Sequence, residues 1–183
     1  MKFLIPIIFF ISFIIKAEND QHHHENDHNH EKEKTNNLEA HQHGVSKLNI
    51  VQENNKIIFE FEMPGYDIVG FEYKARKKED IKKTRTSLDL LKISNNMLEL
   101  SLEAECSNEL TFSEVIYEGS HSEFISKYGF ICKNIKKLND IKINFFDTFS
   151  NSKYLEINIV TSKIAKALKV KKDKNRINVK DFF

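Results

Sequence analysis

The sequence predicts an α+β protein, mostly an antiparallel β sheet or sandwich, with one amphipathic helix. Two patterns carry this prediction: apolar and polar residues alternate with a period of two in several short segments, and only one segment has clear helical spacing. With 183 residues, 40% of them hydrophobic, the chain is long enough for one domain with a sizeable core. Its 28 basic and 27 acidic residues nearly cancel, so the chain as a whole has no general attraction for nucleic acid.

A β-hairpin is expected at the start of the folded region. Residues 48–50 and 57–63 alternate between apolar and polar, and Asn54-Asn55 between them is a tight-turn signal. Pro64-Gly65 then ends the second strand.

The remaining elements follow from the same two periods. The helix is predicted over 77–91, where apolar residues recur at spacings of three and four. Further strands are predicted at 98–104, 110–117, 124–132, 141–146 and 154–161, with weaker ones at 164–170 and 177–179.

Residues 1–17 have the composition of a secretory signal peptide. Lys2 precedes an apolar run at 3–15, and the small residue Ala17 is the predicted cleavage site. The run is shorter than the roughly 18 to 20 residues that span a bilayer, which disfavours the alternative of an uncleaved anchor. We therefore expect an exported, periplasmic protein with no stable membrane insertion after signal cleavage.

The segment that follows, residues 18–37, contains no apolar side chain. It has nothing to bury that could offset the entropy lost on ordering, so it is predicted to be a disordered His-rich leader. Residues 38–183 are predicted to form the single β-rich domain.

Cys106 and Cys132 are the only cysteines. In an exported protein they are expected to form one disulfide. A Cys metal pair is the alternative, but the spacing does not match the short knuckles of structural zinc sites.

Histidine is concentrated near the N-terminus, where seven of the eight lie between His22 and His43. Neutral imidazole is a common ligand of divalent metals, and a His-x-His pair in an extended chain places two rings on one face, about 6.5 Å apart at Cα. The predicted metal ligands are His22, His23, His24, His28, His30, His41, His43 and His121.

Other interpretations of these histidines stay open. The tract could be an incidental polar tail, a pH-responsive charge brush or a purification tag, and His121 taken alone is more often an ordinary turn residue. Zinc is favoured by ligand type, although copper and nickel accept the same donors. Since binding requires neutral imidazole, affinity is expected to fall below about pH 6.5.

Catalysis is not predicted. The chain has no glycine-rich phosphate loop, no Gly-x-Ser-x-Gly motif and no recognisable carboxylate pair. The basic segments at 76–85 and 166–176 are interpreted as solvated faces rather than as anionic-ligand surfaces.

The chain resembles the ZrgA family of periplasmic zinc-binding proteins associated with zinc uptake. The resemblance rests on AHQHGVSKLNIVQENNKIIFEFEMPGYDIVGFE at 40–72, on Glu105-Cys106, on HSEF at 121–124, on YGFIC at 128–132 and on the step at 146–149. It implies that His41, His43 and His121 match family positions. Two departures are the Tyr73 to Arg76 stretch, where family members commonly have a His and a Pro, and the short segment between the cysteines, where they commonly have a His-rich insertion.

The function expected from these observations is capture of Zn²⁺ through His clusters in support of zinc uptake, with a zinc ABC importer or its binding protein as a partner. A periplasmic buffer for copper, nickel or excess zinc is one alternative. An envelope interaction domain without metal is the other.

Overall fold

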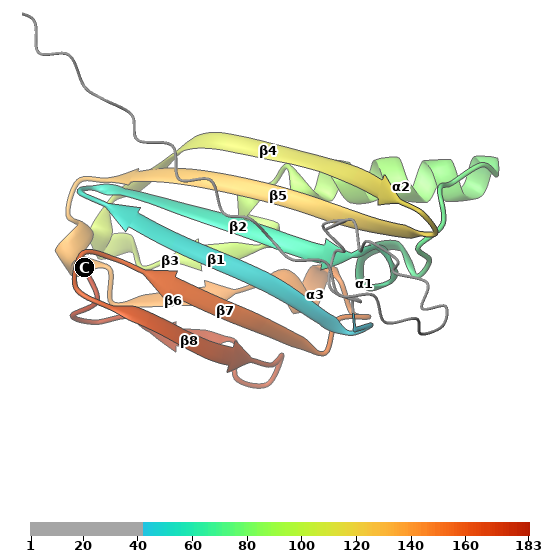
Figure 1. Ribbon diagram of the computed structural model, residues 1–183. Coiled ribbons are helices and arrows are strands. Elements are labelled where there is room, and N and C mark those ends of the chain that lie inside the picture. The colour runs from blue at the N-terminus through green and yellow to red at the C-terminus, as the bar shows by residue number, and fades with distance from the viewer. Residues whose placement is uncertain (1–41) are drawn as a thin grey trace, which may run out of the picture. The chain divides into compact units, whose positions relative to one another are not determined.

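The computed structural model describes residues 42–183, which form two β sheets (Figure 1). Six strands make the large sheet, in the order β4-β5-β2-β1-β7-β8, and three make the small sheet, in the order β3-β6-β9. The large sheet comprises β1 (Val45–Glu53), β2 (Lys56–Pro64), β4 (Cys106–Glu118), β5 (His121–Cys132), β7 (Tyr154–Val160) and β8 (Ala165–Val170). The small sheet comprises β3 (Leu98–Leu100), β6 (Asp140–Ile143) and β9 (Arg176–Asn178).

Neighbouring strands run antiparallel, except for β1 and β7, which are parallel. The small sheet lies behind the large one in Figure 1, so that the two form layers. The predicted α+β class with mostly antiparallel strands is therefore confirmed, and so is the hairpin, whose turn contains Asn54 in the left-handed conformation with φ 54°.

The core lies between these layers because alternate residues of the central strands are buried. It includes the fully buried side chains of Leu48, Ile50, Ile57, Phe59, Phe61 and Tyr128. The hydroxyl group of Tyr128 donates a hydrogen bond to the carbonyl of Leu91. Burial of the ring raises the pKa of Tyr128 well above its ordinary value of 10.0.

Three α-helices accompany the sheets within residues 42–183. The predicted helix is α2 (Lys78–Leu91), while α1 (Gly65–Val69) and α3 (Phe145–Thr148) are short elements that the sequence patterns did not predict. Three short 3₁₀ turns lie at Ser94–Asn96, Leu102–Ala104 and Ile135–Lys137. No helix between residues 42 and 183 has the length and apolar character needed to cross a bilayer.

Two predicted strands are too long. The strand predicted at 98–104 ends at Leu100, and Leu102 begins a 3₁₀ turn in which its side chain is 89% exposed. The strand predicted at 141–146 ends at Ile143, and the next residues form helix α3, in which the neighbouring side chains of Phe145 and Phe146 are both buried. Neighbouring residues of a strand point to opposite faces, so a helical turn is what lets both rings enter one core.

The disulfide prediction is confirmed. Cys106 and Cys132 face each other across β4 and β5, and their sulfur atoms are 2.00 Å apart. The alternative of a Cys metal pair is not realised.

Candidate functional site

The candidate site is at one end of the large sheet, where the start of β1, helix α1 and the start of β5 meet (Figure 1). Two predicted ligands, His43 and His121, are within the described residues and lie at this end. The others, His22, His23, His24, His28, His30 and His41, lie outside the described residues, as do the predicted cleavage site at Ala17 and the leader.

A buried carboxylate fixes the turn that carries His43. Asp67 of α1 is 1% exposed and accepts hydrogen bonds from the Gly44 backbone N–H at 2.6 Å and from the Ser46 hydroxyl at 2.9 Å. The Gly44 carbonyl accepts bonds from the N–H groups of Lys153 and Tyr154 at 2.8 and 2.9 Å. Because both backbone polar groups of Gly44 are bonded to other segments, the position of the preceding His43 is well defined.

Close packing holds α1 against the start of β5. A Cβ atom at Gly65 would lie 2.0 Å from the Ser122 hydroxyl oxygen and 2.8 Å from the Phe71 carbonyl oxygen, so only glycine fits there. The helix ends at Gly70, whose φ of 79° reverses the chain direction. This geometry brings the loop that follows α1, with Glu72, beside His121.

Glu72 contacts both described histidines. Its Oε1 atom is 3.0 Å from Nε2 of His43, and its Oε2 atom bonds to Nδ1 of His121. The Glu72 side chain is 12% exposed, while the two imidazoles are 55% and 61% exposed. The His43 ring also stacks on Tyr66 with a centroid distance of 4.5 Å, which limits its rotation.

The Oε1 atom of Glu72 is a buried acceptor without a hydrogen-bond partner among the described residues. Its 3.0 Å contact with His43 therefore lacks hydrogen-bond geometry. A buried carboxylate oxygen that makes no hydrogen bond is costly, and a cation beside it would offset that cost.

The distance between Oε1 of Glu72 and Nε2 of His43 is close to that between two ligand atoms of one zinc ion. Zinc bonds of about 2.0 to 2.1 Å at tetrahedral angles hold neighbouring ligand atoms about 3.3 Å apart. The observed Oε1 to Nε2 distance of 3.0 Å would need to widen by only a few tenths of an ångström. Residues 42–183 contain no group of three or more His, Cys, Asp or Glu side chains that could hold a metal ion as they stand.

Glu72 is the residue that the sequence reasoning missed. It is the last residue of the Gly-Phe-Glu block, which was noted only for the family resemblance. A signal was present in the chain, since carboxylates commonly ligate or orient zinc-binding imidazoles, but neither spacing nor periodicity relates residue 72 to residues 43 and 121.

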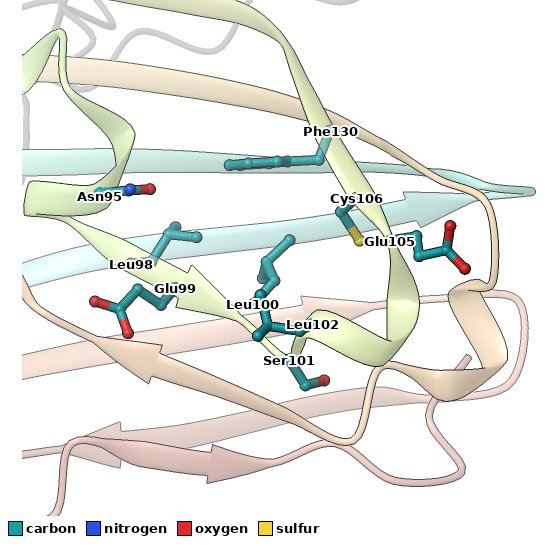
Figure 2. Close-up of a pocket in the computed structure, with 9 residues that line it drawn as sticks. All are labelled: Asn95, Leu98, Glu99, Leu100, Ser101, Leu102, Glu105, Cys106 and Phe130. Carbon is teal, nitrogen blue, oxygen red and sulfur yellow. The ribbon is translucent and has the colours of Figure 1, made fainter.

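Apart from the site at Glu72, the fold has a cavity of about 450 Å³ between β3 and the β4–β5 pair (Figure 2). Its lining includes Leu98, Leu100 and Phe130, with Glu99 and Glu105 among its polar groups. Both carboxylates are already used within the fold: Glu99 accepts from Asn144 at 2.7 Å, which lowers the pKa of Glu99, and Glu105 bonds to Lys133 and Asn134. The residues that line this cavity include no histidine.

Two comparisons with known proteins bear on the identity of the chain. No curated protein sequence matches the chain. A family model described as "ZrgA family zinc uptake protein" matches residues 40–179, which include His43, Glu72 and His121. The chain therefore belongs to the ZrgA family of zinc uptake proteins.

Proposed function

We propose that the protein is a periplasmic zinc-binding protein that captures Zn²⁺ through its His clusters and supports zinc uptake. Membership of a zinc uptake family supports the role. The largely buried Glu72 carboxylate, which contacts both imidazoles and whose Oε1 atom makes no hydrogen bond, is the observation that supports a specific site.

The proposed ordered site uses three side chains of the described residues. Glu72 supplies a carboxylate oxygen, and His43 and His121 supply ring nitrogens. Zinc commonly takes four ligands, so one position remains for a further donor. We assign it to His41, two residues before His43, in keeping with the His-x-His spacing.

The leader adds separate binding capacity in this proposal. His22, His23, His24, His28 and His30 are interleaved with carboxylates, and they would bind further zinc ions with lower affinity, because ordering a chain on binding costs conformational entropy. A zinc ABC importer or its binding protein is the proposed recipient of the metal.

The test is a zinc titration by calorimetry and native mass spectrometry on residues 18–183. Glu72→Gln keeps the shape of the side chain but removes its charge, and it should remove the tightest zinc ion. The matched control is Glu62→Gln, a partly buried carboxylate on β2 that bonds to Asn49 and lies outside the site. Equal zinc binding by both variants would contradict the assignment of Glu72.

Two further forms separate the ordered site from the leader. His43→Ala/His121→Ala should lose the tight zinc ion and retain the weak ones, whereas deletion of 18–37 should do the reverse. A chain that binds no zinc in any form would favour an interaction domain without metal.

Growth of a deletion strain decides between uptake and buffering. Uptake predicts poor growth when zinc is chelated. Poor growth only under an excess of zinc, copper or nickel would identify a buffer instead.

A further inference from the structure

A cavity of about 590 Å³ lies next to the site at Glu72, between the start of α2 and the turn that joins β4 to β5. The first wall contains Tyr73, Lys74, Arg76, Lys77 and Asp80. The second wall consists of Gly119 and Ser120. Tyr73 follows Glu72 in the chain and Ser120 precedes His121, so this basic cavity adjoins the proposed metal ligands.

The walls of the basic cavity carry three cations and one carboxylate, a formal charge of +2. The carboxylate of Asp80 is already engaged, since it accepts a hydrogen bond from the Tyr73 hydroxyl at 3.1 Å.

The three cations have no acidic partner among the described residues. Lys74 lies 5.8 Å from the ring centroid of Tyr117, and neither Arg76 nor Lys77 makes an ion pair within residues 42–183. Some cations elsewhere in the fold do have acidic partners, as in Lys127–Glu60, Lys142–Glu99, Lys169–Glu156 and Arg176–Asp140.

Unpaired cations around a concave surface concentrate a positive potential, and this potential attracts small anions. The guanidinium group of Arg76 can bind a carboxylate or phosphate through two parallel hydrogen bonds, while lysine contributes a point charge. Gly119 leaves its side of the cavity open, because a Cβ atom built there meets no heavy atom within 4 Å.

We propose that the basic cavity binds a small oxyanion with two or more negative charges, such as a tricarboxylate or a phosphate. The expected coupling to zinc rests on the proposed function, whereas the anion site itself does not. A zinc ion on Glu72 and an anion in the adjoining cavity attract each other, so each raises the affinity for the other by the same factor.

The experiment titrates tricarballylate, a tricarboxylate that chelates zinc weakly, into metal-free residues 18–183, with inorganic phosphate as a second probe. Lys74→Ala/Arg76→Ala/Lys77→Ala removes the cavity cations. The control Lys82→Ala/Lys83→Ala/Arg85→Ala removes two lysines and one arginine from exposed positions of α2 that do not line the cavity. Both variants change the net charge equally, and circular dichroism checks that both are folded.

We expect at least one probe to bind saturably, and the cavity variant to bind it about tenfold more weakly, a loss of about 1.4 kcal/mol. The control should stay within about threefold, a change of less than 1 kcal/mol. No saturable binding of either probe, or an equal loss in both variants, would overturn the proposal. The probe that binds decides between carboxylate and phosphate chemistry.

A repeat with zinc-loaded protein separates the two proposals. Tighter anion binding with zinc supports the adjacency of the two sites, and unchanged affinity overturns the coupling. If the protein binds anion but no zinc, the anion site stands and the proposed function fails.

Discussion

Replacement of Asp67 by alanine should destabilise the fold and weaken zinc binding together. The carboxylate is 1% exposed and accepts hydrogen bonds from the Gly44 N–H and the Ser46 hydroxyl. Its removal leaves the Gly44 N–H buried without an acceptor. The Ser46 hydroxyl retains only its 3.3 Å contact with Ser152.

The size of the effect follows from these two bonds. A buried donor that loses its partner costs about 1 to 3 kcal/mol, and the second hydroxyl bond is partly replaced, so Asp67→Ala should lower the free energy of unfolding by about 2 to 4 kcal/mol. For a domain of this size, this corresponds to a melting temperature roughly 4 to 16 °C lower.

Urea denaturation followed by circular dichroism measures the change in the free energy of unfolding. Asp147→Ala is the matched control, because this aspartate is 60% exposed and its 3.3 Å ion pair with Lys172 should contribute at most about 1 kcal/mol. Zinc affinity is then measured at a temperature where Asp67→Ala is folded, and it should fall because His43 is no longer held. An effect of Asp67→Ala no larger than that of the control would refute the reasoning.

Three further predictions concern the fold. Joint replacement of Cys106 and Cys132 by alanine should lower the free energy of unfolding by about 3.5 kcal/mol, because the disulfide closes a loop with a sequence separation of 26 and so reduces the entropy of the unfolded chain. Urea denaturation without reductant measures this loss, and an unchanged midpoint would contradict it. The pKa of Tyr128 is raised in the folded protein, so its neutral hydroxyl contributes fully to stability below the unfolded pKa of 10.0, and this contribution is lost as the pH rises above that value. The melting temperature of Tyr128→Phe, measured as the pH is raised above 10, should therefore fall less than that of the wild type. Gly65→Ala should lower both melting temperature and zinc affinity, since its Cβ would lie 2.0 Å from the Ser122 oxygen; wild-type values for both would show that α1 can shift freely.

The sequence was a good guide to strands β1, β2 and β7 of the large sheet because each has one buried and one more exposed face. That condition holds in β1, where Leu48 and Ile50 are fully buried while Lys47 and Asn49 are not. It fails at Leu102, which continues the alternation of Leu98 and Leu100 but points into solvent in a 3₁₀ turn. The alternation of apolar and polar residues indicates where a strand can form, but β3 extends only as far as it pairs with the short strand β6.

The site was predicted in part. His43 and His121 were named from residue type and family resemblance, yet nothing local in the sequence indicated that both would meet Glu72, which is 49 residues from His121. That meeting depends on the packing of Gly65 against Ser122 and on the bonds to Asp67, which are tertiary contacts. The basic segment 76–85 was interpreted as a solvated face, and only the fold shows that Arg76 and Lys77 line a cavity.

The exposure of the site favours zinc as cargo over zinc as a structural ion. Structural zinc sites are closed by four protein ligands and contribute directly to folding. Here the carboxylate is 12% exposed but both imidazoles are more than half exposed, so another molecule could reach a zinc ion bound as proposed through the histidine side. The fold has its own sources of stability in the buried core and the disulfide between Cys106 and Cys132. Loss of zinc should therefore leave the sheets intact, as the release of cargo requires.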